Sequence, residues 1–121
     1  MNTKQIMELD FRKEESKEII QKVLKQIKPL SRYSGECEIP LNAIEKVLFA
    51  MYHKYGYGIQ YAMPGFNSND KNIVWYVRII RMQKDSQKIL GIDTVYGISI
   101  YEAMAKATIR IYTEIRKRTK K

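Results

Sequence analysis

Hydrophobic residues recur at helical spacing in the first part of the chain. Between residues 11 and 28, apolar side chains three and four positions apart form one stripe, which predicts an amphipathic helix. Asp10 is suited to cap this helix, and Pro29 to end it, because the residue before a proline avoids the helical region. Residues 6–9 fit an extra turn ahead of it. The stripe consists of Ile19, Ile20, Val23, Leu24 and Ile27.

A second helical pattern begins at Pro40, a residue well suited to the first turn of a helix. Its apolar face is broad and reaches Tyr55. Gly56 then stands where helices commonly end on a left-handed glycine. Residues 29–38, between the two helices, are rich in turn formers and predict a connection. The apolar face consists of Leu41, Ile44, Val47, Leu48, Met51, Tyr52 and Tyr55.

The period of the pattern changes to two after the second helix, which indicates strands. The central segment, NIVWYVRIIRM, is rich in branched and aromatic residues, which favour a strand. Turn-forming residues separate it from its neighbours. The predicted elements are a strand at 57–63, a loop at 64–72, a strand at 72–82, a turn at 83–87 and a strand at 88–97.

The last pattern is again helical and begins at Ser99. Ser99 and Glu102 have the spacing of a capping box, in which the serine hydroxyl binds a backbone amide of the first turn. Two alanines keep the apolar seam thin, so the helix can lie close to a sheet. The seam consists of Ile100, Met104, Ala107, Ile111 and Ile115, with Ala103 beside it.

These elements predict an α+β fold, in the order helix, helix, strand, strand, strand, helix. A three-stranded antiparallel sheet should pack against the second and third helices. The length of 121 residues fits one domain. Within it, residues 40–117 should form the core, residues 1–28 a helical arm or added layer, and residues 116–121 a basic tail.

Alternation along the strands assigns side chains to two faces of the sheet. Trp75, with Ile73, Val77 and Ile79, should face the helices, joined by Leu90, Ile92 and Tyr96 from the third strand. The opposite face is too apolar to remain in water. Either the first helix or a second copy of the chain should cover it. The interface candidates on this face are Val74, Tyr76, Ile80, Ile89 and Val95.

Positive charge is concentrated at the end of the chain. The formal net charge is +9, and residues 99–121 carry seven basic and two acidic side chains. Such a skew favours attraction to nucleic acid or to an acidic protein. The alternative is a solvated basic face, which also suits a helix C-terminus. The candidate binding residues are Lys106, Arg110, Arg116, Lys117, Arg118, Lys120 and Lys121.

The order helix, three strands, helix over residues 41–117 resembles that of the double-stranded-RNA-binding domain. Small phage-type sandwich proteins and other α+β modules share this order. The resemblance implies lysines at the start of the last helix, where they and the helix N-terminus grip phosphates. Here that turn is Ile100-Tyr101-Glu102, and Glu102 would repel a phosphate. We therefore expect this helix start to satisfy its own backbone and to close a core.

Candidate catalytic or metal-binding residues are few. His53 is the only histidine and Cys37 the only cysteine, so a zinc site has almost no ligands to draw on. Nothing in the sequence brings these two side chains together as a nucleophile and base, and no glycine loop has the context of a phosphate cradle. We expect no enzyme, cofactor or metal. A single thiol, a charged N-terminus and no long apolar run indicate a cytoplasmic protein without a membrane span.

The sequence thus favours a small non-enzymatic binding module that meets nucleic acid or an acidic protein through its basic C-terminal helix. The alternative is an interaction or self-assembly module that uses the apolar sheet face as its interface, as in a homo-oligomer. The two differ in salt dependence. Binding driven by lysine and arginine weakens with salt, whereas association through an apolar face does not.

Overall fold

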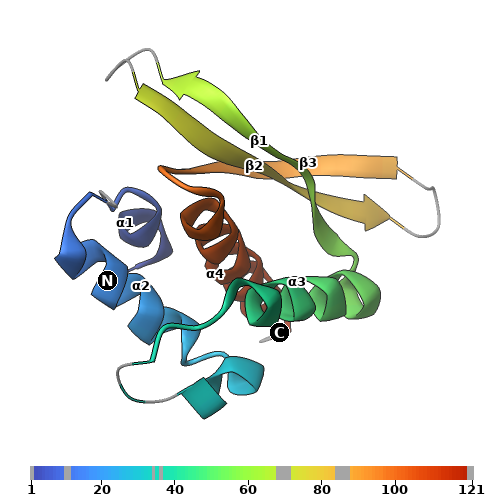
Figure 1. The fold of residues 1–121 in the computed structure, drawn as a ribbon. Helices are drawn as coiled ribbons and strands as arrows, with labels where there is room; N and C mark the ends of the chain where they lie inside the picture. Colours follow the sequence, from blue (N-terminus) through green and yellow to red (C-terminus); the bar gives the residue numbers. More distant parts are fainter. Residues whose placement is uncertain are drawn as a thin grey trace.

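Helices and strands follow one another in the predicted α+β order (Figure 1). The computed structural model describes residues 2–9, 12–33, 35, 37–67, 72–83 and 88–119, with backbone only for residues 61–67, 72–74 and 119. The elements are α1 (Thr3–Met7), α2 (Glu14–Leu24), the 3-10 helix η1 (Lys28–Tyr33), α3 (Leu41–Tyr55), β1 (Tyr57–Asn67), β2 (Asn72–Gln83), β3 (Lys88–Gly97) and α4 (Ile100–Thr119).

The first predicted helix is shorter than its hydrophobic stripe. Helix α2 ends at Leu24, and the chain then tightens into turns in which Ile27 N donates to Leu24 O at 3.0 Å and Leu30 N to Ile27 O at 2.8 Å. These bonds span three residues, as in a 3-10 helix. They keep Ile27 and Leu30 buried, so the apolar pattern continues along the chain beyond the end of α2. The predicted cap Asp10 lies outside the described residues.

Helix α3 ends as predicted. Gly56 adopts φ 80°, a left-handed conformation, and its amide donates to Tyr52 O at 2.9 Å. A side chain here would also clash, because an added Cβ would lie 2.9 Å from Met82 O in β2. Gly56 therefore lets the chain turn sharply from α3 into β1.

The three strands form an antiparallel sheet in the order β1-β2-β3. Strand β1 runs four residues beyond its predicted end and pairs Pro64 with Trp75 and Asn67 with Asn72. The predicted loop at 64–72 is therefore wrong for residues 64–67, and its remainder at 68–71 lies outside the described residues, as do residues 84–87 of the predicted turn. A proline is tolerated here because β1 is an edge strand.

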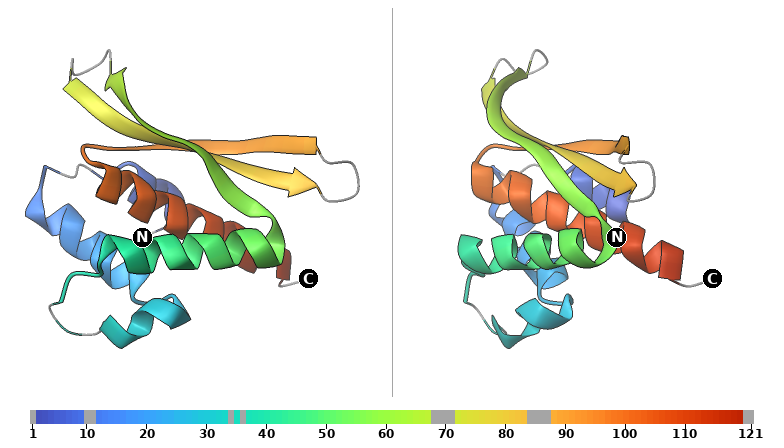
Figure 2. Two further views of the ribbon diagram at one scale, coloured as in Figure 1. Left: turned by 45° about the vertical axis from the view of Figure 1, so that its right-hand side comes forward. Right: turned by 90° about the vertical axis from the view of Figure 1, so that its right-hand side faces the viewer.

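The described helices lie on one side of the sheet (Figure 2). Helix α4 runs between the sheet and the other helices and contacts all three strands as well as α1, α2 and α3. It is consequently buried on several sides at once, as the side chains of Ala103, Ala105, Ala107, Ile109 and Ile111 show. The expectation that the first helix covers the far face of the sheet is wrong, because α2 packs its stripe against α4 instead.

The assignment of side chains to sheet faces is correct for β2 and wrong for part of β3. Val77 and Ile79 are fully buried, and Trp75 packs partly buried on the same side. In β3, however, Val95 is 3% exposed and Tyr96 is 54% exposed, the reverse of the prediction. A bulge causes this reversal, since Asp93 pairs with Ile79 but Gly91 pairs with Ile80, which leaves Ile92 as an extra residue.

On the far face of the sheet, which we call the outer face, Ile80 is only 7% exposed. Its cross-strand neighbours are Gly58 and Gly91, which have no side chains. The space beside them is taken by Tyr52 and Arg78, whose atoms lie 2.9 and 2.8 Å from the positions a Cβ would take. Ile80 and the inward-facing Val95 are therefore not available as interface residues. The side chain of Val74 is not among those described.

Candidate binding surface

The predicted basic stripe does not form one exposed surface. Lys106 is 3% exposed, and its Nζ donates to Met7 O at 2.7 Å and to Leu9 O at 3.4 Å. These carbonyls lie at and just beyond the C-terminal end of α1, where a positive charge is favourable. Lys106 therefore joins α1 to α4, and the prediction that it contacts a partner is wrong. The spacing of the basic residues suggested an exposed face because only one side of this helix was expected to be buried. In the structure, α4 is covered on several sides.

Arg110 is also engaged within the fold. Its Nε lies 3.1 Å from Asp93 Oδ2 in β3, and its Nη1 lies 2.8 Å from Glu114 Oε2 one turn along α4. Arg118 approaches the other oxygen of Glu114 at 3.9 Å. The hydrogen bond from Arg110 lowers the pKa of Glu114 below its ordinary value of 4.5. Arg110 thus clamps α4 to the sheet and has little charge left to offer a partner.

The remaining basic residues of α4 are exposed. Arg116, Lys117 and Arg118 lie on its last turns, and the guanidinium of Arg116 sits 5.7 Å from the centre of the Tyr112 ring. Lys120 and Lys121 lie outside the described residues. The exposed part of the predicted site is therefore the C-terminal end of α4, beside Tyr112.

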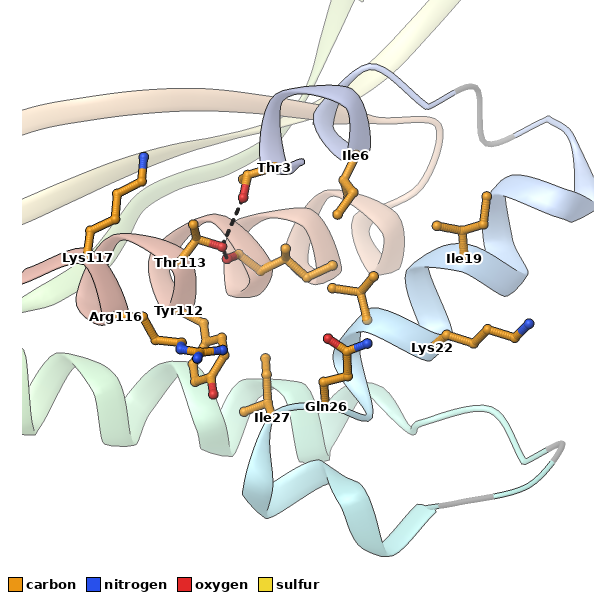
Figure 3. Close-up of a pocket in the computed structure, with 12 residues that line it drawn as sticks. Thr3, Ile6, Ile19, Lys22, Gln26, Ile27, Tyr112, Thr113, Arg116 and Lys117 are labelled. Carbon is orange, nitrogen blue, oxygen red and sulfur yellow. Dashed lines mark hydrogen bonds between the residues drawn. The ribbon is translucent and has the colours of Figure 1, made fainter. Parts of the chain in front are cut away.

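A first groove opens beside this end, between α1, α2 and α4 (Figure 3). Its volume is about 660 Å³. Thr3 Oγ1 donates to Thr113 Oγ1 at 3.1 Å across one side of it. Tyr112 and Arg116 extend into it from α4, toward Gln26 and Ile27. The rest of its lining is mainly aliphatic, with Ile6, Ile19, Val23 and Ile109.

A second groove, of about 560 Å³, lies between η1, α3 and α4. Its floor is apolar and recessed, since Val47, Met51 and Ile115 are only 6%, 7% and 7% exposed. Exposed cations surround the floor: Lys28 and Arg32 come from the η1 side, and Lys46 and Lys54 from α3. Lys54 Nζ also lies 5.4 Å from the centre of the Tyr55 ring.

The two grooves are adjacent, because Ile27 and Tyr112 line both of them. Among the described residues, every charged side chain that lines either groove is a lysine or an arginine. We call this combined surface the basic groove. Its cations are Lys22, Lys28, Arg32, Lys46, Lys54, Arg116 and Lys117.

Five of these seven cations were missed by the sequence analysis. Lys22, Lys28, Arg32, Lys46 and Lys54 come from α2, η1 and α3, in segments whose net charge is modest. Only the packing of these elements around α4 brings them together. The one signal available in the sequence was the apolar face of the second helix, which Lys46 and Lys54 flank.

Other chemically interesting side chains serve the fold. The Tyr101 hydroxyl donates to Ile39 O and accepts a bond of 2.7 Å from Gln21 Nε2, and burial raises its pKa. His53 lies edge-on to Phe49 at 4.4 Å, and Cys37 is exposed. Within the described ranges, no group of histidine, cysteine and carboxylate side chains could hold a metal ion.

Comparison of the chain with protein-family models, with curated proteins and with solved structures found no match. None of the helices in the described part of the chain is long and apolar enough to cross a membrane. The basic groove is therefore the feature from which a function can be argued.

Proposed function

We propose that this protein is a small non-enzymatic binding module that holds an acidic segment of another protein in the basic groove. One observation carries the proposal: the cations around an apolar floor come from α2, η1, α3 and α4, and no described carboxylate lines the same surface. A surface of one sign attracts ligands of the opposite sign and accelerates their encounter. The lone, exposed Cys37 fits a reducing, cytoplasmic setting.

Three lysines of this groove have no ion pair within the described part of the fold. Lys22, Lys28 and Lys46 are exposed and make no ion pair with any residue that the structure describes. The carboxylates of Asp93 and Glu114 are paired with Arg110, which does not line the groove. An acidic ligand would therefore meet lysines that have no competing partner among these residues.

The floor of the groove favours a polypeptide over a nucleic acid. Val47, Met51 and Ile115 are apolar and not aromatic, so they bury apolar side chains well but give bases no plane on which to stack. Two tyrosines, Tyr55 and Tyr112, also line the groove, but Lys54 and Arg116 already lie over their rings. A nucleic acid would use the cations and leave most of the floor unused. An acidic segment that also carries apolar residues would use both.

The test compares fluorescently labelled polyglutamate with a single-stranded oligonucleotide, by anisotropy at low and high salt. We expect polyglutamate to bind at low salt and to dissociate as salt screens the lysines. The double variant Lys46→Glu/Lys54→Glu should weaken binding by about tenfold or more, and the control Lys13→Glu/Lys88→Glu by less than about threefold. Both variants change the net charge equally, and the control residues are exposed and outside the groove.

Absence of polyglutamate binding would contradict the proposal. So would equal losses in the two double variants, because net charge would then account for the attraction. Tighter binding of the oligonucleotide would replace the acidic protein by nucleic acid as the partner.

Self-association through the outer face of the sheet is the second candidate. No described helix covers this face, and Tyr76 and Tyr96 lie together on it with ring centres 6.4 Å apart. Ile89, 48% exposed, lies further along β3. Light scattering should then show an oligomer that persists at high salt and dissociates in the variant Tyr96→Lys. A monomer at all salt concentrations would exclude this candidate.

A further inference from the structure

We infer that the segment held by the basic groove is an acidic amphipathic helix, with its apolar stripe on the groove floor and its carboxylates toward the lysines and arginines of the rim. This inference rests on the proposed function and specifies the partner. It concerns mainly the second groove, between η1, α3 and α4, because there a single helix, α3, contributes both apolar floor residues and cations.

The groove has the length of a helical partner. On α3, its lining residues recur at helical spacing and occupy one continuous face from Ala43 to Lys54. Eleven residues separate these two, or roughly 17 Å along the helix axis. This is about three turns, enough to contact side chains at positions i, i+3, i+4 and i+7 of a second helix. The α3 residues that line the groove are Ala43, Lys46, Val47, Ala50, Met51, Lys54 and, next to the last of these, Tyr55.

The small residues of this face permit close packing. Ala43 and Ala50 lie on the groove-lining face of α3 between larger side chains, so that a helix could approach to the distances of about 8–10 Å seen between packed helices. Tyr112 and Ile115 of α4 line the same groove. The volume of about 560 Å³ lies within the range of sites that enclose a ligand's apolar groups.

The arrangement of polarity matches an acidic amphipathic helix. The apolar side chains are recessed, and exposed cations stand on both sides: Lys46 and Lys54 on α3, and Lys28 and Arg32 at η1. A helix with an apolar stripe and flanking glutamates would place each kind of side chain against its complement. A flat anionic membrane could contact the cations, but its acyl chains would not reach a floor that lies below them.

The test uses two labelled peptides of identical composition. In the patterned peptide, leucines recur at i, i+3, i+4 and i+7 and glutamates flank them. In the scrambled peptide, the leucines form no stripe. We expect the patterned peptide to bind the full chain at least about tenfold more tightly than the scrambled one. Circular dichroism of the mixture should show that the patterned peptide gains helix on binding.

Two variants on neighbouring positions of α3 locate the contact. Ala50 is exposed in the groove, and Phe49, 66% exposed, points away from it. Ala50→Glu places a carboxylate on the floor and should weaken patterned-peptide binding by about tenfold or more, whereas Phe49→Glu should change it by less than about threefold. Both changes add a glutamate to an exposed position of the same helix, so both proteins should fold.

The outcomes separate this inference from the function on which it rests. Equal, salt-sensitive binding of the two peptides would overturn the inference and leave the acidic partner in place. If neither peptide nor polyglutamate binds, both are overturned. Equal effects of Ala50→Glu and Phe49→Glu, or tighter binding to anionic vesicles or an oligonucleotide than to the patterned peptide, would also overturn the inference.

Discussion

At the scale of single residues, Lys106 shows that basic residues at helical spacing need not form a basic surface. Lys106, Arg110 and Lys117 fall at helical intervals, yet the first is buried, the second is paired within the fold and the third is exposed. Whether each of these side chains is buried, paired or exposed depends on which element covers that part of α4. That information lies in tertiary packing and not in the local pattern.

Replacing Lys106 by methionine should destabilise the protein. The variant keeps an apolar stem of similar length but loses the bonds to Met7 O and Leu9 O, which would remain without this donor. We expect the free energy of unfolding to fall by about 1–3 kcal/mol in a urea titration. The control Lys117→Met, on an exposed turn of the same helix, should stay within about 0.5 kcal/mol of the wild type. Equal effects of the two changes would show that Lys106 has no special role.

Ser99 caps α4 as predicted, since its Oγ accepts a bond of 3.2 Å from Glu102 N. We expect Ser99→Ala to lower the free energy of unfolding by about 1 kcal/mol, because an amide of the first turn loses its acceptor. Ser99→Asp, which keeps an acceptor, should retain most of that stability. A neutral Ser99→Ala variant would mean that another group satisfies this amide.

At the scale of elements, helix and strand types were predictable, whereas the register of β3 was not. Strand periodicity defines two faces only while the alternation is unbroken. The extra residue Ile92 reverses the faces of the residues that follow it, and so it exchanges Val95 and Tyr96. Gly91, next to Ile92, is a residue type that often marks a bulge, but the prediction used alternation alone and so assigned the pair wrongly.

A pair of substitutions tests this register. Val95→Ala should reduce stability by roughly 2 kcal/mol, because it removes buried apolar surface. Tyr96→Ala should cost less than Val95→Ala, although it deletes a larger side chain, since Tyr96 is mostly exposed. Denaturant unfolding of both variants makes the comparison. A larger loss of stability for Tyr96→Ala than for Val95→Ala would contradict the bulge and favour an uninterrupted alternation of faces.

Arg110 pairs with Asp93 of β3 and with Glu114 one turn along α4, and the Glu114 pair should make stability depend on pH. Because the folded-state pKa of Glu114 is lowered, its contribution is present above the ordinary pKa of 4.5 and is lost as the pH falls through the folded-state value. Glu114→Gln should therefore lower stability at neutral pH and flatten the decline in acid. An unchanged pH profile for Glu114→Gln would contradict a contribution of this pair to stability.

At the scale of the whole molecule, the α+β class and the element order followed from hydrophobic periods, caps and turn residues such as Ser99 and Gly56. The position of α4 between the sheet and the other helices did not. It required Lys106 to face α1 and Ile109 to face the groove between α1 and α2, in addition to the seam predicted to face the sheet. The basic groove depends on this position, because its cations come from four separate elements.

The most direct test of the account is to locate an acidic ligand on the molecule by nuclear magnetic resonance. Isotopically labelled protein would be titrated with the patterned acidic peptide while backbone amide shifts are followed. We expect the largest changes on Lys46, Ala50 and Lys54 of α3 and on the α4 turns from Tyr112 to Lys117. Changes concentrated instead on the outer sheet face, at Tyr76 and Tyr96, would contradict it.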